Sequence, residues 1–401
     1  MFQSSKIYNR AQVREFARGE VFQYEQNHRN CQKFPIEHVK KMHEIGLLSL
    51  LLPKSYGGPE LPVTELIHVT RELAFGSASF GATLIGNMLG QSAIMMYAHG
   101  ELKKELCHKI ASQYGLWSFG MTEGDVGSDL LATQTKAFRT KDGFTLKGEK
   151  NFITNATYAT DMVVFARLFG VDGKDEGISC FYVPGEIEGL KRGPIMDKIG
   201  WHKANTGTLL FENIKLPSNY LVGEVGNGLR ILTHCLNRSK TLLGGVGVGI
   251  AERALNLVFE RLAGVERYNK KLSDQSAIRH LLARLYTKVN AAWLLTEQAA
   301  KAWDAGQPAV KEASMAKLFS GSTAIEVCSQ TMELFGARGF FNDFEISRLM
   351  MDAKAIEIVE GPSLVQELLI AKEILKSSSI SMEEQKHDLF TLKKSDLRAA
   401  A

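Results

Sequence analysis

Apolar residues recur at helical spacing through the first part of the chain. In "FPIEHVKKMHEIGLLSLLLP", four apolar residues share one helical face: Ile36, Val39, Met42 and Ile45. A second segment with the same period, "VTELIHVTRELAFG", follows the loop "SYGGPELP". The pattern predicts an N-terminal α-helical domain over residues 1–115.

From residue 116 to 222 the apolar period shifts to two. "KAFRTKDGFTLKGEK" carries a hairpin signal at Asp142-Gly143 between short alternating strands. "DMVVFARL", "GISCFYVPG" and "NTGTLLFENIKLP" are typical of further strands. Because no helical pattern separates them, we expect a middle domain built as an antiparallel β-sheet or barrel, not as βαβ units.

Long helical patterns return between residues 223 and 375. "AERALNLVFERLAGV", "SAIRHLLARLYTKVNAAWLLTEQAAKAWDAG" and "AVKEASMAKLFSGSTAIEVCSQTMELFG" carry apolar residues at i, i+3 and i+4. Several long neighbouring helices predict a C-terminal four-helix bundle. Residues 376–401 are polar and predict a loose tail. The expected fold class is therefore α+β, mostly α, with three domains.

Composition and charge exclude several classes of protein. The chain has 401 residues and a net charge of +4, which gives no electrostatic case for nucleic acid binding. No apolar run approaches the roughly 18 residues of a membrane span, and the N-terminus does not resemble a signal peptide. The cysteines are scattered, which predicts reduced thiols and a cytoplasmic protein. The histidines show no metal-ligand spacing, so no metal site is expected.

The glycine cluster "GGVGVG", residues 244–249, invites comparison with phosphate-binding loops. It matches neither GxGxxG nor a Walker sequence, and no strand pattern precedes it. We interpret these glycines as small residues that let two helices approach closely.

Two segments of the middle domain carry candidate ligand-binding groups. In "FGMTEGDVGSD", residues 119–129, the hydroxyls of Thr122 and Ser128 alternate with glycines, so the loop could bind a phosphate or a polar ring edge, or could be an ordinary acidic turn. In "KNFITNA", Phe152 and Thr154 point to one side of a strand, which suits a stacked flat ring. Neither segment is specific by itself.

In their order along the chain, these segments resemble the acyl-CoA dehydrogenase family over residues 8 to 375. "TEGDVGSD" corresponds to the family's T-E-P-x-x-G-S-D, and "FITN" to W-I-T-N. "FGARGF" corresponds to F-G-G-x-G-[FY], and "MDAKAIEIVEGP" to R-D-A-K-x-x-x-I-Y-E-G-T. Four motifs in the correct order make a specific signal.

The resemblance implies FAD-dependent α,β-dehydrogenation of an acyl thioester. In this family the glutamate of E-G-T takes the α proton while the flavin accepts the β hydride, and Glu360 aligns with that glutamate. Burial would raise the pKa of this carboxyl and make it a better base near neutrality. Some members place the base just before an arginine in the helix that opens the bundle. Ser239 and Lys240 stand there, and neither is an acid.

The resemblance also implies the binding residues. Residues aligned with FAD contacts are Phe119, Met121, Thr122, Gly127, Ser128, Phe152, Thr154, Arg267, Tyr268, Glu333, Gly336 and Ala337. Residues aligned with substrate contacts are Ser128, Asn237, Arg238, Lys240 and Gly361.

Several positions depart from the family pattern on the adenosine and pyrophosphate side of FAD. Val265 replaces an arginine, Glu333 a glutamine, Pro362 the threonine of E-G-T, and Leu364 a polar residue. Each lost hydrogen bond costs about 1 kcal/mol, so we expect FAD to bind weakly. Since the family makes some of these contacts between subunits, the standard tetramer is also in doubt. Phe152 replaces the usual tryptophan beside the flavin ring, which keeps the stacking surface and loses an N–H donor.

The implied partners follow from the family. The substrate would be an acyl group on coenzyme A or on a carrier protein, and electrons would pass to an electron-transferring flavoprotein or to oxygen. The expected assembly is a homodimer or homotetramer. Two alternatives stay open: a flavin monooxygenase of the same superfamily that uses reduced flavin from a partner reductase, and a non-catalytic binding protein of the same shape.

Overall fold

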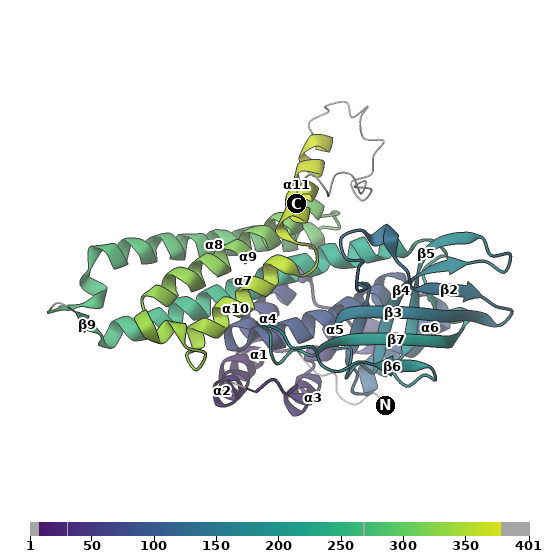
Figure 1. The fold of residues 1–401 in the computed structure, drawn as a ribbon, viewed down its shortest axis with the longest axis horizontal. Helices are drawn as coiled ribbons and strands as arrows, with labels where there is room; N and C mark the ends of the chain where they lie inside the picture. The colour runs from purple at the N-terminus through teal and green to yellow at the C-terminus, as the bar shows by residue number, and fades with distance from the viewer. Residues whose placement is uncertain (1–7, 30, 268, 378–401) are drawn as a thin grey trace.

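The computed structural model of the protein describes residues 8–29, 31–267 and 269–377. It has an N-terminal group of helices, a middle sheet and a C-terminal group of long helices (Figure 1). The predicted fold class is confirmed. The greater part of the predicted polar tail, residues 378–401, lies outside the described residues.

The N-terminal region contains short helices and two longer helices, α4 and α5. The elements are α1 (Arg10–Phe16), η1 (Ala17–Val21), α2 (Phe22–Asn27), α3 (Ile36–Glu44), η2 (Leu47–Ser49), η3 (Lys54–Tyr56), α4 (Val63–Gly76), α5 (Ala78–Tyr97) and α6 (Gly100–Ser112). α4 begins directly after Pro62, and its first two backbone N–H groups, of Val63 and Thr64, donate to the carboxylate of Asp304 at 2.7 and 3.0 Å. A carboxylate at a helix N-terminus satisfies free N–H groups and matches the helix dipole. A residue of the C-terminal region therefore caps an N-terminal helix.

The middle region forms an eight-stranded sheet, in the order β6-β7-β3-β2-β4-β5-β8 with β1 beside β4. Its elements are β1 (Trp117–Gly120), η4 (Leu130–Ala132), β2 (Lys136–Arg139), β3 (Gly143–Thr154), β4 (Asp161–Phe169), β5 (Asp175–Pro184), β6 (Leu190–Arg192), β7 (Thr206–Pro217), η5 (Ser218–Tyr220) and β8 (Leu221–Val222). The hairpin predicted at Asp142-Gly143 joins β2 to β3. Most pairs are antiparallel, as expected, but β1 and β2 each pair with β4 in parallel.

The C-terminal region is a bundle of long helices that extends away from the sheet (Figure 1). Its elements are α7 (Gly228–Gly264), β9 (Glu266–Arg267), β10 (Lys270–Lys271), η6 (Leu272–Asp274), α8 (Ser276–Asp304), α9 (Val310–Glu333), η7 (Gly336–Phe340), α10 (Glu345–Ile358) and α11 (Ser363–Ser377). By length and composition α7 would pass as a membrane span, yet 78% of its most apolar window is buried inside the protein, as in the core helix of a bundle.

The glycine cluster lies on α7 and explains how tightly this helix packs. A Cβ added at Gly244 would meet Thr296 Oγ1 of α8 at 2.6 Å, and one at Gly245 would meet Thr70 Oγ1 of α4 at 2.4 Å. One at Gly247 would meet the carbonyl oxygen of Ser320 on α9 at 3.0 Å. The prediction that these glycines allow close helix approach is confirmed.

Candidate active site

A cavity of about 420 Å³ lies where the three regions meet. Its wall comes from α5, from β1 and the loop after it, from the end of β3, from α7, and from the turn between α10 and α11. Nine residues predicted at the cofactor or the substrate line it together: Phe119, Met121, Thr122, Gly127, Ser128, Phe152, Thr154, Glu360 and Gly361. Segments more than two hundred residues apart in sequence therefore converge on one cavity.

Phe152 presents an open aromatic face to the cavity. The pairing of β3 with β7 shifts register between Lys150 and Ile153, and Phe152 within this bulge has a φ of +61°. Its side chain stays 59% exposed, which is unusual for a large apolar residue. Thr154, two residues on, places a hydroxyl on the same cavity wall. A flat ring stacked on Phe152 would cover this apolar surface.

The loop after β1 is fixed by a buried ion pair. Lys150 of β3 has no exposed surface, and its ammonium donates to Glu123 Oε1 at 2.7 Å and to the carbonyl oxygen of Met121 at 2.9 Å. The Glu123 carboxylate also accepts the backbone N–H groups of Gln134 and Thr135. Burial lowers the pKa of Lys150 to about 8, and the charge of Glu123 opposes this shift. The loop that carries Thr122 and Ser128 is thus anchored at its first residues.

The end of β3 is held closely against α5. Asn155 donates from its side-chain amide to the carbonyl oxygens of Thr83 on α5 and Trp117 on β1, at 3.1 and 2.9 Å. A Cβ at Gly86 would lie 2.8 Å from Thr154 Cγ2. The absence of a side chain at this helix position therefore lets the Phe152–Thr154 wall come into place.

Glu360 lies in the turn that joins α10 to α11. Its Oε1 accepts a hydrogen bond from Ser239 Oγ of α7 at 2.6 Å. Its Oε2 is shielded from solvent and has no hydrogen-bond partner within the part of the chain that the structure describes. Its backbone has a φ of +54°, a conformation that costs a non-glycine residue about 1–2 kcal/mol. Strain of this kind is common at functional sites.

The electrostatic surroundings of Glu360 favour a base that titrates near neutrality. Burial raises the pKa of Glu360 to about 7, against the opposing effects of the Ser239 hydrogen bond and the positive charges of Lys240 and Lys317. Burial in turn lowers the pKa of each lysine to about 8, while the charge of Glu360 acts in the other direction. The carboxyl group of Glu360 and the ammonium groups of the two lysines therefore share a poorly solvated cluster beside the cavity.

The remaining cavity wall is apolar. α5 contributes Ala82, Ile85 and Leu89, and α7 contributes Leu236 and Leu243.

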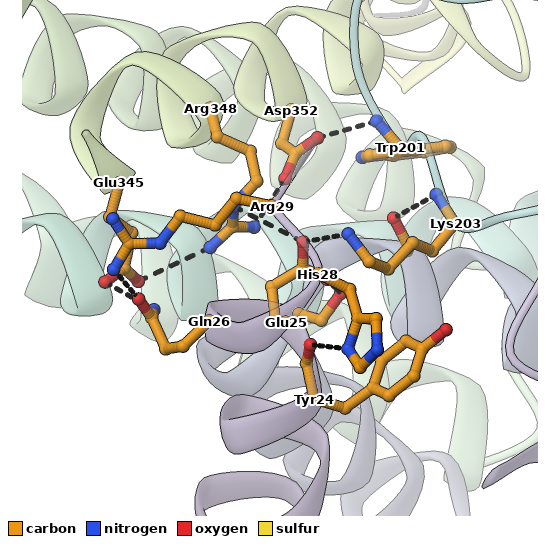
Figure 2. A network of polar contacts seen from close by, with 12 residues as sticks. Tyr24, Glu25, Gln26, His28, Arg29, Trp201, Lys203, Glu345, Arg348 and Asp352 are labelled. Carbon is orange, nitrogen blue, oxygen red and sulfur yellow. Dashed lines mark hydrogen bonds and ion pairs between the residues drawn. The ribbon is translucent and has the colours of Figure 1, made fainter. Parts of the chain in front are cut away.

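Trp201 also lines the cavity, and a buried polar network positions it. The backbone N–H of Trp201 donates to Asp352 Oδ1 at 2.6 Å, and Asp352 pairs with Arg348 one turn earlier on α10 (Figure 2). Arg348 in turn pairs with Glu25 of α2. The carboxylate of Glu25 also accepts a hydrogen bond from the ammonium of Lys203 at 2.8 Å. These charges connect all three regions beside the cavity.

The other predicted site residues do not line the cavity. Lys240 donates to Asn237 Oδ1 at 3.3 Å on the same helix, and Nε of Arg238 is buried without a hydrogen-bond partner among the described residues. Glu333, Gly336 and Ala337 lie at and after the end of α9, away from the cavity wall. Arg267 belongs to β9, at the far end of the bundle from the sheet (Figure 1). Tyr268 lies outside the described residues. The family makes the FAD contacts expected of these positions across a subunit interface, so the roles of these residues stay predictions.

Sequence reasoning missed several residues that shape the site. Trp201 and Gly86 carry no local signal, because their partners lie in distant segments. Lys317 does carry one: it interrupts the small residues of "ASMAKLFSGSTA" on a helix face that is otherwise buried. A lysine in such a stripe indicates a buried polar partner.

The residues at the cavity fit a flavin ring. The structure supplies an uncovered aromatic face at Phe152, hydroxyls at Thr122, Ser128 and Thr154, and a loop of exposed glycines. Such a combination of a flat apolar wall and a few polar groups is typical of a cofactor site.

Comparison with known proteins finds one matching family along nearly the whole chain. Residues 7–114, 118–214 and 226–375 match the N-terminal, middle and C-terminal domains of acyl-CoA dehydrogenases. The mitochondrial short-chain specific acyl-CoA dehydrogenase of Bos taurus is 32% identical over 92% of this chain and 89% of its own length.

Two solved structures share the fold. Butyryl-CoA dehydrogenase from Megasphaera elsdenii has a TM-score of 0.87 and 26% identity over 92% of this chain and all of its own. A chain in a structure reported for the electron transferring flavoprotein of Acidaminococcus fermentans has a TM-score of 0.87 and 30% identity, over 92% of this chain and 97% of its own. The protein described here therefore belongs to the acyl-CoA dehydrogenase family, and it is an oxidoreductase that acts on a CH–CH group with FAD as its cofactor.

Proposed function

We propose that Glu360 is the base that removes the α proton of an acyl thioester. The observation that carries this proposal is the position of its carboxylate, which lies at the wall of the cavity that Phe152 and Thr154 also line. One carboxylate oxygen is held by Ser239, and the other is shielded and unpaired among the described residues. An acid with a pKa of about 7 is mostly ionised just above neutrality and remains a strong enough base to accept a carbon-bound proton.

FAD, when bound, supplies the acceptor for the hydride that leaves the β carbon. The chain's own residues would bind and orient the cofactor and the thioester. Phe152 would stack on the ring, and the Thr154 hydroxyl would hydrogen-bond to its edge. Thr122 and the glycines of its loop would hold the polar parts of the cofactor. The backbone N–H of Glu360 would donate to the thioester carbonyl oxygen, which stabilises the negative charge that develops there as the α proton leaves.

We propose a short, uncharged acyl group as the substrate. The α5 and α7 walls of the cavity are apolar, and a buried carboxylate on the substrate would find no cation among these lining residues. The short-chain specificity named for the Bos taurus relative and the butyryl-CoA named for the Megasphaera elsdenii structure support this choice.

We further propose coenzyme A as the carrier of the acyl group and a cytoplasmic location for the protein. The similarity to a structure reported for an electron transferring flavoprotein supports such a protein as electron acceptor over oxygen.

The test is an anaerobic titration of the FAD-loaded protein with butyryl-CoA, longer straight-chain acyl-CoA thioesters, glutaryl-CoA and a carrier-protein butyryl thioester. We expect the flavin absorbance to bleach most completely with butyryl-CoA. Glu360→Gln should bind the same ligands without bleaching, whereas Glu357→Gln, three residues earlier and paired with Lys354, should bleach like the wild type.

Three outcomes would contradict the proposal. Bleaching that survives Glu360→Gln would remove Glu360 from the mechanism. Preferential bleaching by glutaryl-CoA or by the carrier-protein thioester would refute the proposed substrate. If no thioester bleaches the flavin, the monooxygenase or the non-catalytic alternative gains support.

A further inference from the structure

A buried lysine of α9 holds the turn that carries Glu360. The side chain of Lys317 is 1% exposed, and its ammonium donates to the carbonyl oxygen of Gly361 at 2.6 Å and to that of Glu357 at 3.2 Å. Glu357 belongs to the last turn of α10, where carbonyl groups lack partners within the helix. One ammonium group therefore donates hydrogen bonds both to the end of α10 and to the turn that follows it.

Gln366 of α11 contacts the same turn from the other side. Its side-chain amide donates to the carbonyl oxygen of Gly361 at 2.8 Å and to that of Glu360 at 3.2 Å. Gln366 has no exposed surface, so water does not compete for these carbonyls. The carbonyl of Gly361 thus accepts from two buried side chains that belong to different helices.

The backbone of this turn needs such support. Glu360 has a φ of +54° and Gly361 a φ of +93°, so two consecutive residues adopt a left-handed conformation. The conformation is free for glycine but costs the glutamate about 1–2 kcal/mol. If the carbonyl contacts were lost, Glu360 could relax to a negative φ, and its carboxylate would turn away from Ser239.

The helices are placed so that Lys317 reaches the turn. Gly321 follows Lys317 by one turn of α9, and a Cβ at Gly321 would lie 3.2 Å from Ile356 Cγ2 of α10. The missing side chain brings the end of α10 close to α9. The contact of Lys317 with Glu357 and Gly361 therefore depends on the close packing of α9 against α10.

We propose that Lys317 is a positioning residue for the base: together with Gln366 it holds the strained Glu360–Gly361 backbone so that the carboxylate of Glu360 faces the cavity. The proposal rests on the proposed function of Glu360. Lys317 does not line the cavity, and it acts through the turn and not on the substrate.

Lys240 offers a matched comparison for Lys317, because it carries a similar charge near Glu360 but donates no hydrogen bond to the turn. Lys240 and Lys317 are both buried, and the positive charge of each lowers the pKa of Glu360. The hydrogen bond of Lys240, however, goes to Asn237 Oδ1 on its own helix. Lys240→Met and Lys317→Met thus remove similar charges near Glu360, and only the second removes a donor from the turn.

The kinetic test is stopped-flow reduction of the FAD-loaded proteins by butyryl-CoA from about pH 6 to 9, which covers the titration of Glu360. Both lysine variants should move the acid limb of the rate profile to higher pH. At the high-pH plateau, Lys317→Met should reduce the limiting rate about a hundredfold, the effect of a misplaced catalytic group, with little change in substrate Kd. Lys317→Arg should recover part of this loss. A plateau rate for Lys317→Met equal to that of the wild type would overturn the proposal.

A second measurement separates this proposal from the function of the protein. Hydrogen–deuterium exchange should be faster across residues 357–366 in Lys317→Met, and in Gln366→Leu if the lysine variant does not fold, but unchanged there in Lys240→Met. If no thioester reduces the wild-type protein, the function of Glu360 fails while the exchange data still decide whether Lys317 holds the turn. Unchanged exchange in both donor variants would refute the role of Lys317.

Discussion

Glu360→Gln should raise the free energy of unfolding, and this gain over the wild type should increase with pH. The reason is that the wild-type carboxyl is held in a site that disfavours its charge. Burial raises the pKa of Glu360 from 4.5 to about 7. Each pKa unit corresponds to about 1.36 kcal/mol, so the shift amounts to about 3 kcal/mol. Since the folded-state pKa lies above the unfolded value, the wild type has its full stability below about pH 4.5 and loses this increment as the pH rises to about 7.

The amide of the variant does not titrate, so the variant escapes that loss. Its advantage in unfolding free energy should be near its minimum at about pH 5 and about 2–3 kcal/mol larger at pH 8. For a chain of this length, each kcal/mol moves the unfolding midpoint by roughly 1–2 °C, because the entropy of unfolding scales with size. The gap in Tm between variant and wild type should therefore widen by about 2–6 °C across this range.

Differential scanning fluorimetry of both proteins from about pH 5 to 8 would measure this gap. Glu357→Gln is the control, since Glu357 lies three residues before Glu360 and pairs with Lys354 at 2.8 Å near the protein surface. A pH-independent gap for Glu360→Gln would show that the carboxyl titrates normally, which would refute the electrostatic basis for its role as base.

Three further predictions test the site. Ser239→Ala should move the acid limb of flavin reduction up by about one pH unit, since it removes a hydrogen bond to the ionised form of Glu360; an unchanged limb would contradict the observed contact. Gly86→Ala should lower the FAD content after purification because its Cβ would displace the end of β3, whereas Gly19→Ala, which has nothing within 4 Å of its added Cβ, should not; equal FAD content in both would contradict this reading. The wild type should lose FAD on extensive dialysis, and Pro362→Thr should retain more; stoichiometric FAD in the dialysed wild type would show that the substituted contacts are compensated.

Local patterns in the sequence predicted the domain types and their order, because helical and strand periods are set by which residues face the core. The hairpin at Asp142-Gly143 and the helix after Pro62 follow from local chemistry and are present in the structure. The parallel pairs of β4 with β1 and β2 could not be read in the same way, since pairing between segments distant in the chain leaves no periodic signature.

The motifs identified the segments that meet at the cavity, but not how they are held. Phe152, Thr154 and Glu360 were each predicted from a motif, and the structure brings them to one wall. The contacts of Lys317 and Gln366 with the turn were not predicted, because they depend on the angle between helices. The bulge at Phe152 was also missed, since an alternating pattern implies an even strand.

The close fit of α7 against its neighbours constrains how this enzyme could acquire a different substrate. Thr70, Thr296 and Ser320 sit where side chains at the α7 glycines would have to go, so this helix has no room to slide or tilt. The same helix carries Leu236 and Leu243 in the cavity wall and Ser239 against the base. Changes in acyl preference are therefore expected to arise by exchange of individual side chains along α5, with the spacing between α7 and the base kept constant.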